Sequence, residues 1–178
     1  LFANEPVNRI KSIWEEYHES KESSVGMHIP GDRHEKIVKR LEESSFFVLP
    51  IFKDNIKESY LMLLSQLQGS FVALTYLEDY KKDPMNAKAW QSTILYDDFV
   101  KEKDLTLIRS DFNPYLTKEE SVNATKSLIH LYEDDEAYGQ QVHDPRMKKG
   151  TLALVTQSSG ALGAHQHKKS ALKKGVPS

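Results

Sequence analysis

The sequence of 178 residues contains no cysteine. That absence excludes disulfides, thiolate nucleophiles and zinc or iron–sulfur sites with cysteine ligands, and it fits a reducing compartment without requiring one. No run approaches the roughly 18 apolar residues of a membrane-spanning helix. The formal net charge is −2, so the sequence has no basic excess that would attract nucleic acid. We therefore expect neither membrane insertion nor a nucleic-acid partner.

Motifs of the common enzyme classes are also missing. The sequence has no GxSxG, GxxxxGK[ST], GxGxxG or HExxH pattern. Asp97 and Asp98 offer two carboxylates, but adjacent residues in a turn point apart. His34 has no acid or second histidine at the spacing of a catalytic or metal site, so we expect it to be structural. These absences argue against an enzyme without excluding one, and we expect no catalytic residue, no metal site and no cofactor.

Hydrophobic residues are concentrated in residues 46–80. Residues 46–52 predict a strand, and Pro50 indicates that it lies at a sheet edge or near a strand end. Residues 58–67 predict a second strand, and residues 71–78 return after a turn at 68–70, so the pair is typical of a hairpin. In the second strand, one face carries Tyr60, Met62 and Leu64 and the other Leu61, Leu63 and Leu67. Because both faces are apolar, we expect both to be covered, by helices or by a partner.

Other stretches predict four further strands and three helices. The strands are Val25–Ile29, residues 88–96, Leu105–Arg109 and Thr151–Thr156. The first helix follows Asn4-Glu5-Pro6, with Trp14 and Tyr17 on its apolar face. The second follows Asp32, with Glu35 as a capping-box partner, and the third spans residues 117–134 with a capping box of Thr117 and Glu120. The acidic run at 133–136 is interpreted as a solvated helix end, because it lacks the spacing of a calcium loop.

The elements do not alternate as βαβ units, which favours an α+β fold. We predict a single twisted, mainly antiparallel sheet of six to seven strands with three packed helices. It forms one domain over residues 1–156. Residues 157–178 are rich in Ser, Gly, Ala and Lys and are expected to form a disordered tail, in which His165 and His167 accompany four lysines. Any targeting peptide would lie upstream of Leu1.

The order of features from Trp14 to Val155 resembles a known family. The residues that carry the resemblance are Ile13–Tyr17, the Leu-Pro strand Phe46–Pro50, Tyr60–Met62 with Gln66, Phe71–Leu74 leading to Glu78, Tyr80 and Lys81, then Ile94–Tyr96, Lys103–Leu107 and Leu128–Tyr132. This order is similar to that of the assembly factors of mitochondrial F1-ATP synthase that chaperone the unassembled β subunit.

The resemblance implies a non-enzymatic holdase in the mitochondrial matrix. Such a protein binds the F1 β subunit before the α subunit does, prevents its aggregation and leaves when α arrives, without a nucleotide of its own. We expect it to be a monomer.

A chaperone of one subunit is expected to expose an apolar surface rimmed by charge. The predicted partner-binding residues are Tyr60, Met62, Leu64, Trp14, Tyr17, Glu78 and Tyr80. The first three belong to one face of the hairpin, where Met and Tyr suit an adaptable binding surface. Trp14 and Tyr17 come from the first helix, and Glu78 and Tyr80 from the patch that resembles the family's. A purely internal role for the hairpin face fits the pattern equally well.

Two other functions stay open from the sequence. One is a small-ligand-binding or hydrolytic domain with a pocket between the sheet and helix 117–134, which convergent polar groups would support. The other is a structural subunit of a larger complex.

Overall fold

The computed structural model describes residues 2, 4–53 and 60–143. By its internal contacts the chain divides into Leu1–Gln140, which holds the fold described below, and Gln141–Ser178. The predicted strand Thr151–Thr156 and the tail with His165 and His167 lie outside the described residues. The predicted limits of 1–156 and 157–178 therefore stay a prediction.

Six strands form one antiparallel sheet in the order β1-β6-β5-β4-β3-β2. They are β1 (Ser24–Pro30), β2 (Phe46–Phe52), β3 (Tyr60–Gln68), β4 (Phe71–Tyr76), β5 (Ala89–Tyr96) and β6 (Leu105–Phe112). The predicted α+β fold with an antiparallel sheet is confirmed. β2 lies at one edge of the sheet, as Pro50 indicated.

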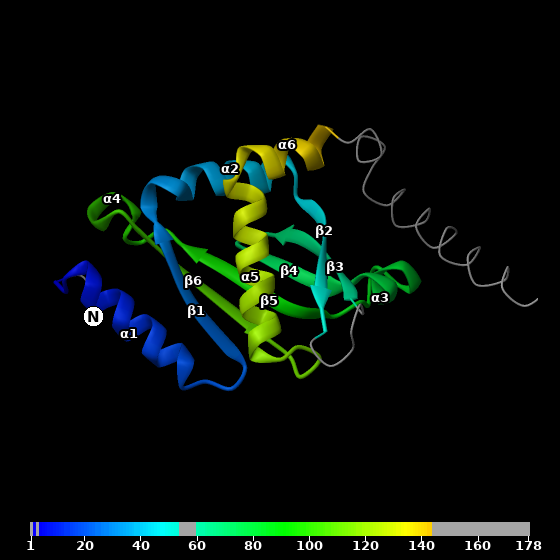
Figure 1. Ribbon diagram of the computed structural model, residues 1–178, viewed down its shortest axis with the longest axis horizontal. Coiled ribbons are helices and arrows are strands. Elements are labelled where there is room, and N and C mark those ends of the chain that lie inside the picture. Colours follow the sequence, from blue (N-terminus) through cyan, green and yellow to red (C-terminus); the bar gives the residue numbers. More distant parts are fainter. Residues whose placement is uncertain (1, 3, 54–59, 144–178) are drawn as a thin grey trace, which may run out of the picture. The chain divides into compact units, whose positions relative to one another are not determined.

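Six α-helices accompany the sheet in the described residues. They are α1 (Val7–Glu19), α2 (His34–Glu43), α3 (Leu77–Lys82), α4 (Val100–Lys103), α5 (Lys118–Glu133) and α6 (Asp135–His143). Figure 1 shows α5 crossing the strands on one face, while α1 lies along β1. Among the described helices, none combines the length and the apolar character needed to cross a membrane.

The start of α5 is fixed by the predicted capping box. The Thr117 side chain accepts the Glu120 N–H at 3.1 Å, and the Glu120 carboxylate accepts the Thr117 N–H at 2.9 Å. Glu120 also accepts a hydrogen bond at 2.7 Å from Lys53, which follows β2. Because these bonds satisfy exposed N–H groups at the helix start, they set where α5 begins and tie it to the sheet edge.

The face of the sheet below α5 has a polar centre. Thr125 of α5 accepts from the Gln91 amide at 3.0 Å and lies 2.8 Å from the Ser110 hydroxyl, which in turn lies 2.8 Å from that of Thr93. All four side chains are buried. Around them, Leu128, Ile129 and Tyr132 of α5 are buried. The buried hydrogen bonds fix the position of α5 on the strands.

The β3–β4 hairpin turns at Gly69 and Ser70, as predicted. Gly69 has a φ of +62°, a left-handed conformation that glycine adopts without a steric penalty. The turn sets the pairing of Gln68 with Phe71, and the register continues to Leu63 opposite Tyr76.

The capping box predicted at Asp32 and Glu35 is wrong. A 3₁₀ turn, Gly31–Arg33, precedes α2, and the residue before α2 makes no side-chain cap. The Asp32 N–H instead donates to the Asp104 carboxylate at 2.8 Å. A tertiary contact, made by a residue 72 positions away, thus replaces the local cap.

The segment after β4 also differs from the prediction. The strand ends at Tyr76 rather than at residue 78, and α3 begins at Leu77. Leu77 is buried, and the acidic pair Glu78-Asp79 stands at the N-terminal end with Lys81-Lys82 at the C-terminal end. This charge order favours a helix through its dipole, although the apolar run before it favours a strand.

Gly26 of β1 packs against His18 of α1, which predicts a sharp effect of one methyl group. A Cβ at residue 26 would lie 2.6 Å from His18 Nδ1, and that ring is buried and bonded to the Trp14 carbonyl oxygen at 2.8 Å. We expect Gly26→Ala to lower the free energy of unfolding by about 1–3 kcal/mol, as overpacking does. Gly139→Ala is the control, because a Cβ there meets nothing within 4 Å. Urea unfolding of both variants measures the difference, and equal midpoints would contradict the assigned α1–β1 packing.

Candidate functional site

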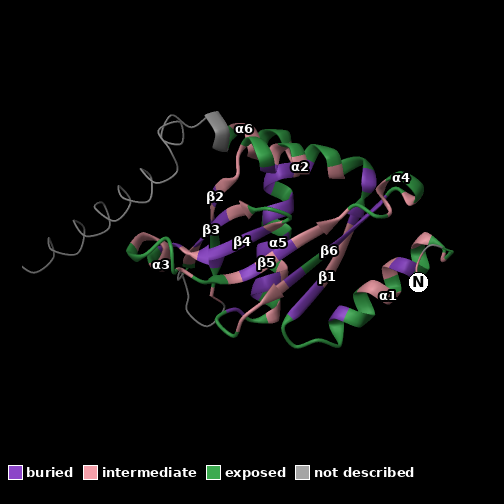
Figure 2. Cartoon of the chain, turned by 180° about the vertical axis from the view of Figure 1, so that it is seen from behind, coloured by how far each residue is buried: buried purple, intermediate pink, exposed green. Residues whose placement is uncertain are grey.

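The sheet face turned away from α5 is the first candidate surface. Side chains alternate along each strand, and Ser110 and Gln91 mark the face that meets α5. The pairing register then places a second set of residues on the other face. We call its β2–β3 part the open face; its members are Phe46, Val48, Pro50, Phe52, Tyr60, Met62, Leu64 and Gln66. Figure 2 views the sheet from this side, with the strands in front of α5.

Two aromatic rings dominate the outer end of the open face. Phe52 is 67% exposed and Tyr60 is 50% exposed, and their ring centroids lie 6.1 Å apart. Met62 is half-buried beside them. Leu64, predicted for the same surface, lies on this face but is only 2% exposed, so it is not available to a partner.

The outer edge of β2 borders this face. The Leu67 N–H donates to the Ser45 carbonyl oxygen, so the alternation of an antiparallel ladder directs the backbone groups of residues 46, 48, 50 and 52 away from β3. Pro50 stands at one of these outward positions, where its missing N–H removes no hydrogen bond to β3. A proline on an exposed edge also hinders the addition of another strand.

The second candidate surface is a groove between α1 and the ends of β5 and β6. It has a volume of about 570 Å³. Its lining, which we call the aromatic groove, is Phe2, Trp14, Tyr17, Tyr96, Phe99, Asp98 and Glu102, with His18, Leu107 and Arg109. The Trp14 indole N–H donates to the Ile108 carbonyl oxygen at 3.0 Å, which holds the ring in place. Tyr17 is 57% exposed at the rim.

The predicted partner-binding residues thus fall into three places. Tyr60 and Met62 lie on the open face, and Trp14 and Tyr17 line the aromatic groove. Glu78 and Tyr80 lie on α3, at the other end of the sheet from α1 in both views (Figures 1 and 2). The structure therefore does not bring these two residues to the aromatic groove. On α3, Glu78 pairs with Lys81 at 2.7 Å, and Tyr80 is half-buried.

Phe52 and the groove residues Tyr96 and Phe99 were not singled out from the sequence. Phe52 follows Phe46 and Val48 at even spacing along β2, and side chains two residues apart in a strand point to the same face. The sequence alone could therefore have placed Phe52 on the open face. Tyr96 and Phe99 meet Trp14 only through tertiary packing.

A ligand pocket below α5 finds no support among the described residues. The hydrogen-bonded side chains of Gln91, Ser110 and Thr125 fill the centre of that interface. A groove of about 460 Å³ beside α5 is lined by charged residues together with Val25, Gly26, Met27 and Val122. Of its charged residues, Glu19 pairs with Lys118 at 3.2 Å and Glu15 pairs with His28 at 2.8 Å. The part of the chain that the structure describes contains no group of three or more His, Cys, Asp or Glu side chains able to hold a metal ion.

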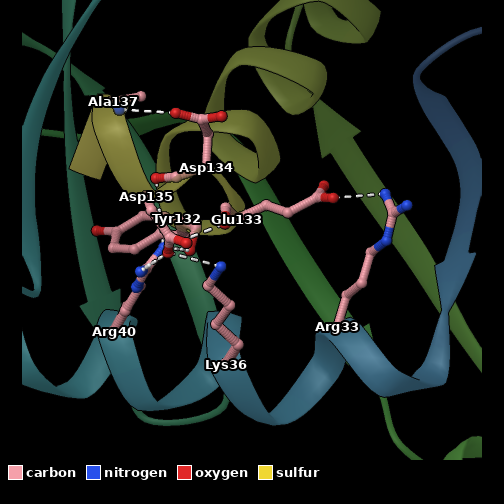
Figure 3. Close-up of polar contacts among 8 residues, drawn as sticks. All are labelled: Arg33, Lys36, Arg40, Tyr132, Glu133, Asp134, Asp135 and Ala137. Atoms are coloured by element: carbon pink, nitrogen blue, oxygen red, sulfur yellow. Dashed lines mark hydrogen bonds and ion pairs between the residues drawn. The ribbon is translucent and has the colours of Figure 1, made fainter. Parts of the chain in front are cut away.

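The acidic run at 133–136 joins the end of α5 to the 3₁₀ turn and α2 through ion pairs. Figure 3 shows Arg33, Lys36 and Arg40 of the 3₁₀ turn and α2 reaching toward it. Arg40 donates to the carbonyl oxygens of residues 132, 133 and 134 at 2.9, 3.1 and 3.3 Å. The carbonyl oxygens of residues 132 and 133 belong to the last turn of α5, where the helix itself supplies no donor; that of residue 134 also accepts the Tyr138 N–H at 3.1 Å. Arg40 therefore caps the C-terminal end of α5.

Comparison with known proteins gives one family. The sequence model of the ATP11 protein family matches residues 1–157. A search of curated proteins finds no match to the chain.

Asp135 is expected to make stability depend on pH in the acid range. Hydrogen bonds from Lys36 and then Arg40 hold the pKa of its carboxyl below the usual value. A lowered folded-state pKa stabilises the fold above the unfolded value of about 3.9, and this contribution is lost as pH falls through the folded-state pKa. We expect Asp135→Asn to be less stable than wild type at neutral pH, with a difference that shrinks under acid and in high salt.

Urea midpoints measured from about pH 7 to 2 give the test. Glu42→Gln is the control, since it removes an exposed carboxylate of α2 that has no ion pair among the described residues. A difference between Asp135→Asn and wild type that stays constant with pH contradicts the assignment.

Proposed function

Because the chain belongs to the ATP11 family, whose members are assembly factors of mitochondrial F1-ATP synthase, we propose that it is a matrix holdase for the unassembled F1 β subunit. It binds β through the open face and keeps it from aggregating until the α subunit takes its place. The protein acts as a monomer and without a cofactor.

The open face is the observation that carries this proposal. It combines exposed aromatic rings, Phe52 and Tyr60, with an adaptable methionine, Met62, on a rigid sheet. Tyr and Met are enriched at the centres of protein interfaces, and a contiguous apolar patch on one face marks an interaction site. Holding a partner in this way requires no bond-making chemistry.

Release follows from competition. An unassembled β subunit exposes the apolar surface that it later buries against α. If the holdase and α cover overlapping parts of that surface, only one of them binds at a time, and the larger permanent interface wins. This exchange needs no nucleotide.

Co-expression with isolated F1 β tests the proposal. We expect β to stay soluble and to co-purify with the chain, and added α to displace the chain from β. Aggregation of β in the presence of correctly folded protein, or a complex that survives excess α, would sink the holdase proposal.

Acidic substitutions on the open face sharpen the test. Phe52→Asp and Tyr60→Asp each place a charge at the proposed contact, and we expect each to weaken β binding by about tenfold or more, as loss of an interface anchor does. The thermal midpoint should change little, because both side chains are half exposed or more. Met62 is half-buried, so Met62→Asp tests whether this side chain contributes to β binding, to the stability of the fold, or to both.

Met85→Asp is the matched control, because Met85 is 90% exposed but lies outside the open face, between α3 and β5. Titration of immobilised β measures all four variants. If Met85→Asp weakens binding as much as Tyr60→Asp does, the open face is not the contact surface.

A further inference from the structure

We propose that the aromatic groove receives an arginine side chain of the partner protein. The identity of that partner as F1 β rests on the proposed function, whereas the chemistry of the groove rests on its own residues. Three features of the groove support the inference: its rings, its charge and its size.

The rings form a fixed aromatic wall. Trp14 and Tyr96 meet edge to face with centroids 5.6 Å apart, and Phe2 and Phe99 do so at 6.3 Å. The bond from the Trp14 indole to Ile108 prevents the largest ring from collapsing into the groove. A cation placed over the face of a tryptophan or tyrosine ring is attracted by the ring quadrupole, most strongly for Trp.

The charge of the groove is negative. Asp98 and Glu102 are both exposed at its rim, and neither has an ion pair or a side-chain hydrogen bond with the described residues. Arg109 also lines the groove, but its guanidinium is engaged by Asp111 at 2.7 Å. Lys103, close by in the sequence, donates to the Glu5 carbonyl oxygen at 3.0 Å. Because the carboxylates of Asp98 and Glu102 are not neutralised by a described residue, the groove can bind a positively charged group.

Arginine fits this combination better than lysine. A planar guanidinium stacks on aromatic faces and binds carboxylates through a fork of N–H donors, while an ammonium is a compact and strongly hydrated charge. A groove of about 570 Å³ has room for the guanidinium, its apolar stem and part of the adjoining backbone. The stem would lie along Phe2 and Phe99 and the charged end beside Asp98 and Glu102.

A small probe separates this inference from the choice of partner. N-acetyl-arginine methylamide is titrated into the protein while the indole ¹H–¹⁵N signals are followed by NMR. The sequence has two tryptophans; Trp14 lines the groove, while Trp90 stacks on Tyr76 and Tyr115 and serves as an internal reference. We expect a saturable shift of the Trp14 signal in the millimolar range and none for Trp90.

Two comparisons decide what is recognised. The uncharged citrulline analogue should leave Trp14 unshifted, and the double variant Asp98→Asn/Glu102→Gln should weaken the arginine response about tenfold. Glu35→Gln/Glu42→Gln removes two exposed carboxylates of α2 instead and should respond like wild type. An absent Trp14 shift, or an equal response to citrulline, overturns the inference.

Binding to isolated F1 β gives the second readout. We expect the Asp98→Asn/Glu102→Gln variant to bind β about tenfold more weakly, with the loss concentrated at low salt. An unchanged affinity for β overturns the partner's use of the groove. If wild type itself fails to bind β, the proposed function fails, while the NMR titration still decides the chemistry of the groove.

Discussion

A sheet of six strands has two faces to cover, and among the described residues α5 covers one of them while α1 covers only part of the other. α5 covers the face that carries Gln91 and Ser110. On the other face α1 reaches β1 and β6, where Ile10 packs with Leu105 and Leu107. At the β2–β3 end of that face, Phe52 and Tyr60 remain exposed. This imbalance between strands and helices leaves an apolar surface on an otherwise well-packed fold, and water penalises such a surface unless a partner covers it.

The firm attachment of α5 makes the imbalance tolerable. Its first turn is held by Thr117, Glu120 and Lys53, and its last turn by Arg40. Its middle is fixed by Thr125 on the polar centre of the sheet. Each contact satisfies groups that burial would otherwise leave unpaired. The strands are therefore held in place from the α5 side, and the open face needs no helix of its own to stay in shape.

The sequence is most informative where local chemistry decides the structure. The Thr117–Glu120 box, the Gly69 turn and the edge position of Pro50 follow from short-range rules and are confirmed. The rules fail where distant residues decide. Asp32 gives its N–H to Asp104, and α3 interrupts what looks like a continuing strand.

The candidate site shows the same division between local and tertiary information. Alternation along β3 assigns Tyr60 and Leu64 to one face correctly, but it cannot tell that the first is exposed and the second buried. Exposure depends on what covers each position, and that is set by tertiary packing. The aromatic groove likewise joins Trp14 of α1 to Tyr96 of β5 and Phe99 before α4, and no sequence spacing predicts their meeting.

The open face and the aromatic groove would contribute differently to the binding of a client protein. An apolar face alone supplies binding energy but little discrimination, because any exposed hydrophobic surface satisfies it. A charged groove alone gives direction and rate, but its energy is limited by the cost of removing water from ions. The two surfaces lie on one side of a single sheet. Under the proposed function, the open face would hold the β subunit while Asp98 and Glu102 select its orientation. If their combined affinity for the client is weaker than that of a permanent subunit interface, the geometry that permits capture also permits release.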